Sequence, residues 1–174
     1  MKFSDGVALI NHPALHTVIL SMWADLGCGT GFFTDILSYL LPKQSVIYAM
    51  DSDEAAIRKV KVADGIALTT FALDFVKDEL PFEKADGILM ANALHYVKDK
   101  AAFVQKLRRH LTVKGILLLV EYDMNIPNPW VPYPLSFAVL TQLCRQNSFA
   151  SVEKINAIAS AFGRADLYGA IIKM

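Results

Sequence analysis

Three alternate glycines, Gly27, Gly29 and Gly31, follow an aspartate, Asp25, in a pattern that can bind a small ligand. Glycine adopts positive φ angles readily and has no Cβ atom to hold a ligand away from the main chain. A dinucleotide-binding turn reads G-x-G-x-x-G and holds a pyrophosphate on a helix N-terminus. Here the spacing differs, and a carboxylate before the first glycine repels a pyrophosphate but favours an ammonium or sulfonium group. The pattern therefore predicts a turn that binds a ligand carrying positive charge.

Asp51 is the second residue whose position indicates ligand binding. It lies twenty residues beyond Gly31, the interval at which the acidic residue of a nucleotide-binding βαβ unit meets the ribose hydroxyls. A carboxylate suits this role because it accepts hydrogen bonds from both hydroxyls together. Asp51 could instead cap a helix expected over 52–62, and the two roles are compatible.

The seven residues 25–31, Asp-Leu-Gly-Cys-Gly-Thr-Gly, resemble the first motif of the class I S-adenosylmethionine (SAM)-dependent methyltransferases. The segment 92–97, Asn-Ala-Leu-His-Tyr-Val, looks like the fourth motif of small-molecule methyltransferases, and the Asn-Pro-Pro-Tyr type of signature found in amino-methyltransferases is absent. The resemblance spans nearly the whole chain, with its specific motifs within 25–96. It implies SAM as the cofactor and methyl transfer to a small-molecule acceptor.

The resemblance also implies a set of cofactor-binding residues. In the family, an acidic residue after the third strand takes the adenine amino group and apolar neighbours hold the ring; Asp74 occupies that position, although it could also be a solvated turn aspartate. The cofactor-binding residues expected on this basis are Asp25, Gly27, Cys28, Gly29, Gly31, Asp51, Ser52, Leu73, Asp74, Phe75, Asn92 and Ala93.

Few catalytic groups are obligatory for methyl transfer, because positioning the acceptor in line with the methyl group can supply much of the acceleration. A general base helps if the acceptor must lose a proton, and His95 is the best placed titratable side chain. A histidine kept for packing or loop hydrogen bonding is the alternative. Trp130 and Tyr133 lie in a proline-rich loop over 123–135 and are candidates for contacting the acceptor, unless they pack on the body of the protein.

The elements that must position these residues alternate along the chain, as in a doubly wound α/β fold. Apolar runs predict strands over 17–23, 45–50, 65–72, 85–92, 116–122, 152–158 and 165–173. Helical patterns occur over 5–16, 32–41, 52–62, 100–111 and 136–146. The last two strands, joined by a turn over 160–163, resemble the antiparallel hairpin that closes the methyltransferase sheet. We therefore expect a three-layer, seven-stranded, mostly parallel sheet with an antiparallel terminal hairpin, a Rossmann-like methyltransferase fold.

The helix expected over 100–111 has the clearest pattern. Asp99 is a suitable N-cap, and Phe103, Val104, Leu107 and Leu111 form an apolar stripe that can face a sheet. The basic residues toward its end suit the helix dipole, which favours a solvated helix end over a patch that binds RNA.

The composition suits one globular domain over 1–174, with 54% hydrophobic and 20% charged residues. The 17 basic and 17 acidic residues cancel, which argues against a strong general attraction to nucleic acid or to an anionic membrane. No apolar run reaches the roughly 18 residues of a membrane span, and the start lacks the layout of a signal peptide. Cys28 and Cys144 belong to no C-x-x-C pair or Cys/His cluster, so we expect free thiols, no metal and a reducing, cytoplasmic compartment.

Two other classes of function stay open on the sequence alone. One is a methyltransferase-like subunit that binds SAM weakly or not at all and acts as a scaffold for a partner, which the short lead before the first strand would suit. The other is a different enzyme of the same fold, such as an aminopropyl transferase or a nicotinamide-dependent oxidoreductase. The missing G-x-G-x-x-G argues against the oxidoreductase, and no paired acidic residues point to a polyamine. An oligomer or a partner subunit is compatible with each of these functions.

Overall fold

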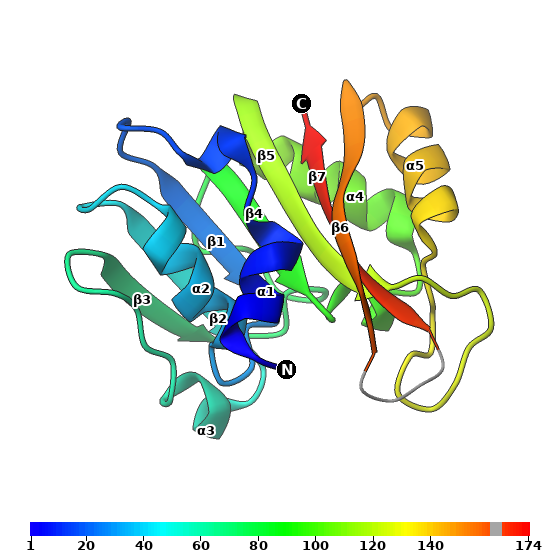
Figure 1. The fold of residues 1–174 in the computed structure, drawn as a ribbon, viewed down its shortest axis with the longest axis horizontal. Helices are drawn as coiled ribbons and strands as arrows, with labels where there is room; N and C mark the ends of the chain where they lie inside the picture. Colours follow the sequence, from blue (N-terminus) through cyan, green and yellow to red (C-terminus); the bar gives the residue numbers. More distant parts are fainter. Residues whose placement is uncertain (161–164) are drawn as a thin grey trace.

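A computed structural model describes residues 1–160 and 165–174 and contains a seven-stranded sheet (Figure 1). The strand order is β3-β2-β1-β4-β5-β7-β6. The strands are β1 (Met22–Leu26), β2 (Val46–Asp51), β3 (Ala67–Ala72), β4 (Ala85–Ala91), β5 (Leu111–Tyr122), β6 (Ser151–Ala159) and β7 (Asp166–Lys173).

The first five strands are parallel, whereas β7 runs antiparallel to both β5 and β6. This pairing confirms the expected mostly parallel sheet with an antiparallel terminal hairpin. The turn expected over 160–163 falls almost entirely on residues 161–164, outside the described part of the chain.

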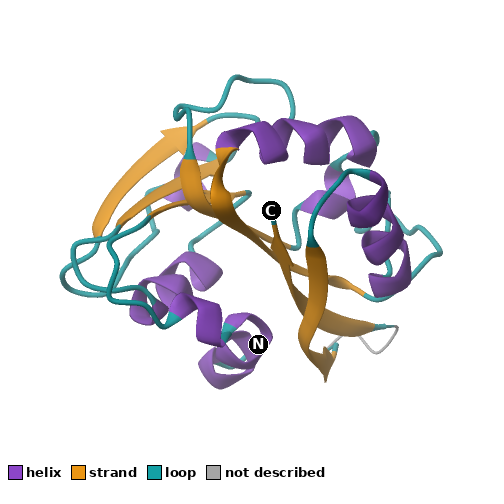
Figure 2. Cartoon of the chain, turned by 90° about the horizontal axis from the view of Figure 1, so that it is seen from above, coloured by secondary structure: helices purple, strands orange, loops and turns teal. Residues whose placement is uncertain are grey.

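Helices cover both faces of the twisted sheet, which gives the three expected layers (Figure 2). One face carries α1 (Phe3–Ile10) and α2 (Phe32–Leu40), and the other carries α4 (Lys100–His110) and α5 (Phe137–Gln146). The short helix α3 (Glu54–Ile57) packs beside β2 and β3, and two 3₁₀ helices, η1 (Pro13–Leu15) and η2 (Leu94–Tyr96), lie in connections. Among the helices that the structure describes, none has the length and apolar character needed to cross a membrane.

Successive side chains along a strand point to opposite faces of the sheet, so the apolar residues divide between two cores, one on each face. In β1, Trp23 packs under α1 and α2, whereas Ala24 and Leu26 face α4 and α5. Leu118 and Leu119 of β5 separate in the same way. Parallel strands buried on both faces read as continuous apolar runs, which is why the sequence showed them clearly.

The first strand runs from Met22 to Leu26, so the prediction of a strand over 17–23 was wrong at both ends. Val18, Ile19 and Leu20 are exposed, at 94%, 72% and 53%. The neighbouring strand β2 begins opposite Met22, at Val46, and therefore offers no partner to the residues before it. Apolar composition alone does not make a strand where no partner strand is available.

Other boundaries also differ from the sequence prediction. The helix expected over 5–16 is α1, which ends at Ile10, followed by the separate 3₁₀ helix η1. The helix expected over 52–62 is only Glu54–Ile57, because the chain then turns so that Val60 approaches the backbone of Gly31. The strand expected from Ile116 starts at Leu111, which pairs with Ala85 before the register shifts. Gly115 therefore lies within β5 instead of preceding it.

Candidate functional site

The glycine turn between β1 and α2 has positive φ at all three alternate glycines, for different reasons. Gly27, Gly29 and Gly31 have φ angles of 77°, 53° and 87°. A Cβ on Gly27 would lie 2.7 Å from the Cβ of Ala93, and one on Gly31 would lie 2.8 Å from Val60. A Cβ on Gly29 would meet no heavy atom of the described residues within 4 Å. Two of the glycines thus permit close packing, whereas Gly29 leaves open space.

The backbone N–H groups of this turn are used within the protein. Gly27 and Cys28 donate to the carbonyl of Met50 at 2.8 and 3.1 Å, and Gly31 donates to the carbonyl of Cys28 at 2.9 Å. The N–H of Gly29 donates to Oδ2 of Asp51 at 2.8 Å. A pyrophosphate site would have free backbone N–H groups at this turn. Here these N–H groups are occupied and the carboxylate of Asp51 lies beside Gly29, which suits a ligand with positive charge.

Asp25 lies beneath the turn and is only 1% exposed. The hydroxyl of Thr34 on α2 donates to its Oδ2 at 2.6 Å, while Oδ1 is buried without a hydrogen-bond partner among the described residues. Burial disfavours the ionised form and raises the pKa of Asp25 from 3.8 to about 7, with a smaller contribution from the charge of Asp51. A cation bound nearby would therefore favour the ionised form of Asp25.

Asp51 does not cap the following helix, so the capping alternative was wrong. Its Oδ1 accepts the N–H of Asp53 at 2.9 Å, and Asp53 itself caps α3 by accepting the N–H groups of Ala55 and Ala56. Each oxygen of Asp51 holds one hydrogen bond to the protein and retains a second lone pair. The carboxylate is thus held in place and can still accept hydrogen bonds from a ligand.

A cavity of about 520 Å³, here named the turn cavity, opens where β1, β2, β3 and β4 end. Eight of the expected cofactor-binding residues line it: Gly27, Asp51, Ser52, Leu73, Asp74, Phe75, Asn92 and Ala93. The other four, Asp25, Cys28, Gly29 and Gly31, belong to the turn and its base and are not among the lining residues. Sequence reasoning missed three lining residues, Val76, Lys77 and Tyr96, which lie one or two residues beyond Phe75 and His95.

Asp74 holds its own turn together at the wall of this cavity. Its Oδ1 accepts the N–H of Val76 at 3.0 Å, and its Oδ2 lies 2.6 Å from Nζ of Lys77. The hydrogen bond from Lys77 lowers the pKa of Asp74. Asp74 is therefore a structured turn aspartate that also lines the cavity, and the two interpretations made from the sequence are compatible.

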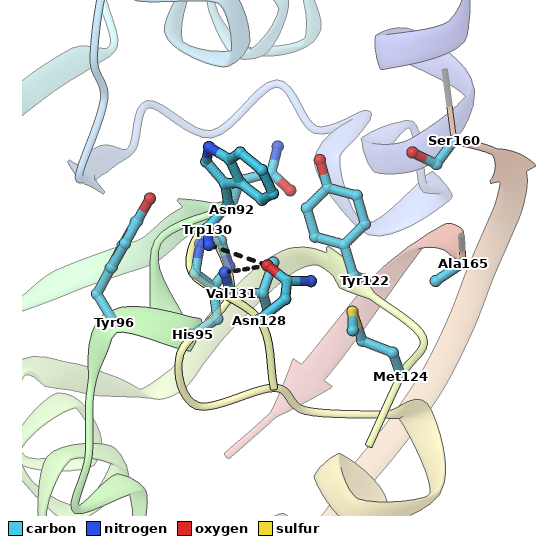
Figure 3. Close-up of a pocket in the computed structure, with 10 residues that line it drawn as sticks. All are labelled: Asn92, His95, Tyr96, Tyr122, Met124, Asn128, Trp130, Val131, Ser160 and Ala165. Carbon is cyan, nitrogen blue, oxygen red and sulfur yellow. Dashed lines mark hydrogen bonds between the residues drawn. The ribbon is translucent and has the colours of Figure 1, made fainter. Parts of the chain in front are cut away.

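A second cavity of about 540 Å³, here named the loop cavity, lies next to the turn cavity under the loop over 123–135 (Figure 3). Asn92 and Tyr96 line both cavities. The lining residues come from segments far apart in the sequence: Asn92, His95, Tyr96, Tyr122, Met124, Asn128, Trp130, Val131, Ser160 and Ala165.

His95 is buried at the wall of the loop cavity and paired with Glu121 at the end of β5. Its Nδ1 lies 2.7 Å from Oε2 of Glu121, and its backbone N–H donates to Oε1 at 3.1 Å. The two side chains are 3% and 1% exposed. A carboxylate that accepts from Nδ1–H leaves Nε2 as the acceptor nitrogen of a neutral imidazole. Sequence reasoning missed Glu121, although a lone carboxylate closing an apolar strand was a signal.

Asn92 forms the wall between the two cavities and has an unusual backbone. Its φ angle is 54°, which is uncommon outside glycine, and its N–H donates to the carbonyl of Val120 at 2.8 Å. Its side-chain Oδ1 is buried without a partner among the described residues. A buried acceptor without a donor is costly, so this oxygen suits a donor group of a ligand.

The loop over 123–135 presents Trp130 on a tight turn. Oδ1 of Asn128 accepts the N–H groups of Trp130 and Val131, both at 2.9 Å, and the ring of Trp130 is 73% exposed. Trp130 lines the loop cavity, as expected of a residue that contacts an acceptor. The alternative, in which the aromatic residues pack on the body of the protein, does not describe Trp130.

Tyr133 lies elsewhere and braces the loop. Its N–H donates to the carbonyl of His95 at 3.0 Å, and its carbonyl accepts from Nζ of Lys100 at 2.6 Å. That ammonium also lies 5.5 Å from the centre of the Tyr133 ring. Tyr133 is not among the residues that line either cavity, so its contacts point to a structural role.

Both cysteines are free thiols, and burial raises the pKa of each, that of Cys144 to about 12. Within residues 1–160 and 165–174, no three His, Cys, Asp or Glu side chains cluster in a way that could hold a metal ion.

Known proteins with similar sequences are methyltransferases and a related synthase. Residues 24–117 match the family described as a methyltransferase domain. A malonyl-[acyl-carrier protein] O-methyltransferase of Bacillus anthracis is 32% identical over 102 residues, which cover 58% of this chain and 37% of that protein. A carboxy-S-adenosyl-L-methionine synthase of Dichelobacter nodosus is 34% identical over 103 residues, which cover 56% of this chain and 43% of that protein. The match thus spans less than half the length of these relatives.

The fold is shared with solved methyltransferases. Magnesium protoporphyrin IX methyltransferase from Synechocystis, solved with bound SAM, aligns with a TM-score of 0.70 at 16% identity over 98% of this chain and 77% of that chain. A SAM-dependent methyltransferase from Mesorhizobium loti aligns with a TM-score of 0.69 at 17% identity over 98% and 99% of the two chains. From the family match, the motif at residues 25–31 and this fold, we conclude that the chain belongs to the class I SAM-dependent methyltransferases.

Proposed function

We propose that this protein transfers a methyl group from SAM in the turn cavity to a small-molecule acceptor in the loop cavity. The observation that carries this proposal is the wall that the cavities share, formed by Asn92 and Tyr96. Ligands on the two sides of one wall can approach each other closely. Such an arrangement suits a displacement in which the acceptor must lie in line with the group that is transferred.

The residues of the turn cavity fit SAM. A volume of about 520 Å³ lies within the range of small-molecule sites. Asp51 retains lone pairs for the ribose hydroxyls, Leu73 and Phe75 supply apolar contacts for the adenine, and Oδ1 of Asn92 is an unpartnered acceptor for an ammonium group. Bound SAM would supply a methyl group activated by a positively charged sulfur. The carboxylate of Asp51 favours that positive charge, and the charge would in turn favour ionisation of the buried Asp25.

His95 is the residue that we propose as general base. Glu121 holds Nδ1, so that Nε2 can take a proton from an acceptor in the loop cavity. The resulting imidazolium would be stabilised by the buried carboxylate of Glu121. Glu121 acts through His95 and is therefore a positioning residue.

The names of the relatives support an acceptor that is a small molecule or a small group on a carrier. One relative is named for a malonyl group on acyl-carrier protein, and one structural neighbour is named for a porphyrin. These acceptors differ widely, so they support the class of reaction without selecting one compound.

Thermal unfolding with SAM, S-adenosylhomocysteine, NAD and ATP in parallel tests this proposal. A ligand at a hundred times its dissociation constant should stabilise the fold by about 2.7 kcal/mol. We expect SAM and S-adenosylhomocysteine to raise the melting temperature and NAD and ATP to leave it unchanged. No shift with millimolar SAM would favour the alternative of a non-catalytic scaffold, and a shift with NAD alone would favour an oxidoreductase.

A further inference from the structure

The loop cavity has little charge available to an anionic ligand. Among its described lining residues, the group that can carry positive charge is His95, and its partner Glu121 places a carboxylate directly beneath it. Burial raises the pKa of Tyr122 in the same wall, and the charge of Glu121 raises it further. An additional carboxylate in this cavity would therefore meet a negative charge behind His95.

Two lysines that contact the loop over 123–135 are occupied by other partners. Nζ of Lys100 donates to the carbonyls of Val97 and Tyr133 at 2.8 and 2.6 Å. Nζ of Lys154 lies 3.0 Å from Oδ2 of Asp123 and 4.6 Å from the centre of the Phe137 ring. Burying a carboxylate without a cationic partner is unfavourable, because the ion loses its hydration.

Aromatic rings form much of the wall of the loop cavity. Tyr96, Tyr122 and Trp130 line it, and the His95 ring lies 4.3 Å from the ring of Tyr96 and 6.2 Å from that of Tyr122, centre to centre. Met124 and Val131 add apolar surface. Aromatic rings of this kind bind flat ligands by offset stacking or edge contacts, with the hydroxyl or amide groups fixing the orientation.

We propose that the methyl acceptor is an uncharged, flat hydroxyaromatic compound, held by these rings with its hydroxyl at His95, and that carboxylate acceptors are excluded. This substrate class rests on the proposed function. The acceptor's O–H proton passes to Nε2 of His95, and the oxygen electron pair forms the new O–CH₃ bond. The electron pair of the broken S–CH₃ bond returns to sulfur, which leaves a neutral thioether, and the proton leaves His95 for water.

Two matched probes test the substrate class, 1-naphthol and 1-naphthoate, which share a ring system and differ in charge at neutral pH. Quenching of tryptophan fluorescence measures their binding in the presence of S-adenosylhomocysteine. Trp130 lines the cavity and Trp23 is buried in the core, so the Trp130→Phe variant identifies the part of the signal that comes from the cavity. Mass spectrometry with SAM then measures formation of the methyl ether or the methyl ester.

We expect 1-naphthol to bind at least tenfold more tightly than 1-naphthoate and to give the methyl ether. Glu121→Gln should strengthen naphthoate binding several-fold without a matching gain for naphthol, because it removes the negative charge beneath His95. Naphthoate binding as tight as that of naphthol, formation of the methyl ester, or binding of neither probe would overturn the proposal. Arg164 falls within the residues that the structure does not describe, and naphthoate binding that is lost in Arg164→Gln would overturn it too.

The order of measurements separates this inference from the proposed function. A melting shift with SAM is measured first, and its absence counts against methyl transfer itself. A normal SAM shift together with preference for naphthoate counts against the substrate class alone.

Discussion

The turn cavity and the loop cavity lie side by side but are built in different ways. The turn cavity is formed by short stretches that directly follow β1, β2, β3 and β4, and much of its geometry comes from backbone hydrogen bonds and glycines. The loop cavity is formed by side chains from β5, η2, the loop over 123–135 and the ends of β6 and β7. Sequence motifs therefore indicate most residues of the turn cavity, whereas the residues of the loop cavity are brought together by tertiary packing alone.

The largest expected effect concerns the open space at Gly29. We expect Gly29→Val to abolish binding of SAM, because a β-branched side chain at positive φ would occupy space that the described residues leave empty. Titration calorimetry measures the binding, and circular dichroism checks that the protein stays folded.

Gly31→Val provides the matched control for packing. A Cβ there would meet the side chain and backbone of Val60, so this variant should mainly lose stability. Unchanged affinity in a folded Gly29→Val protein would show that the cofactor binds elsewhere.

A substitution at His95 changes the loop cavity and leaves the residues that line the turn cavity unchanged. An asparagine can keep a hydrogen bond with Glu121 but lacks the second ring nitrogen, so His95→Asn should lower turnover by roughly 10²- to 10⁴-fold with SAM affinity nearly unchanged. Glu121→Gln should also lower turnover and shift the pH profile, because it changes how His95 is held. Near-normal turnover in His95→Asn would reduce this histidine to a packing residue.

Asp25 should make the stability of the fold depend on pH. Its raised pKa means that between pH 3.8 and about 7 the folded state binds more protons than the unfolded state, so the free energy of unfolding falls as pH rises through this window. A pKa rise of this size corresponds to roughly 4 kcal/mol, at about 1.4 kcal/mol per pH unit, as an order of magnitude.

Asp25→Asn, followed by urea unfolding at several pH values, checks this expectation. Relative to the parent, the variant should gain stability between pH 5 and pH 8, because it has no carboxyl to ionise. A stability difference that stays constant across these pH values would contradict the assignment.

The smallest and most specific expected effect is the weaker SAM binding of Asp51→Asn. Loss of charge-assisted hydrogen bonds to the ribose hydroxyls should cost about 1.5–3 kcal/mol, or roughly one to two decades in the dissociation constant. We expect Asp51→Asn to bind SAM at least several-fold more weakly by calorimetry. It should also lose about 1 kcal/mol of stability, because its amide has one oxygen for the two backbone N–H groups that Asp51 holds.

Asp53→Ala is the matched control, since Asp53 is the residue that caps α3. It should lose about 1 kcal/mol of stability and keep its affinity. Parent-like affinity in Asp51→Asn would place the ribose elsewhere.

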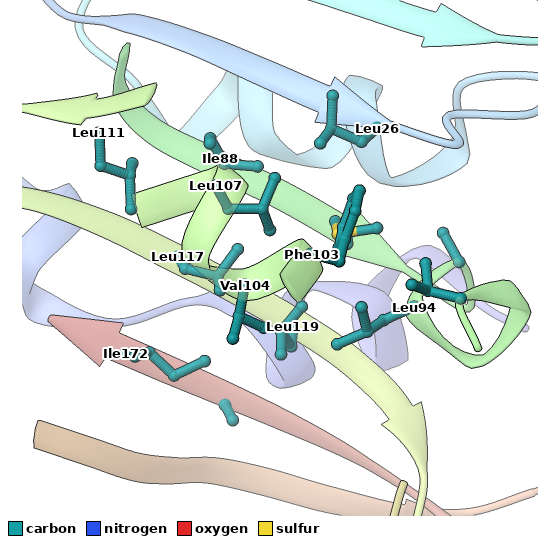
Figure 4. Packing of buried hydrophobic residues seen from close by; sticks show 14 of the residues in the cluster. Leu26, Ile88, Leu94, Phe103, Val104, Leu107, Leu111, Leu117, Leu119 and Ile172 are labelled. Carbon is teal, nitrogen blue, oxygen red and sulfur yellow. The ribbon is translucent and has the colours of Figure 1, made fainter. Parts of the chain in front are cut away.

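The sequence predicted the elements whose patterns depend on local burial. Asp99 caps α4 by accepting the N–H of Ala102, and three residues of the expected stripe pack against β4 and β5 (Figure 4). The fourth, Leu111, is the first residue of β5 and not part of the helix. Figure 4 shows Phe103, Val104 and Leu107 of that stripe within the core. The helical period of the apolar residues was enough to predict this packing.

Other features depended on contacts that no local pattern contains. The residues 18–20 look like a strand, but they find no partner beside β2 and stay exposed. The pairing of His95 with Glu121 joins positions that are 26 residues apart, through the parallel pairing of β4 with β5. Tyr133 has the aromatic character expected of a residue that contacts the acceptor. Its backbone instead forms hydrogen bonds with His95 and Lys100, which hold the loop in place.

The brace at Tyr133 has a consequence for redesign of the enzyme. The loop that carries Trp130 is joined through Tyr133 to the carbonyl of His95 and to Lys100. A loop transplanted from a relative to alter acceptor choice would therefore also displace His95 unless the segment 92–100 moved with it. The smallest interchangeable module on this side of the protein is thus the loop together with that segment, and a library that varies the loop alone would also move His95, the proposed general base.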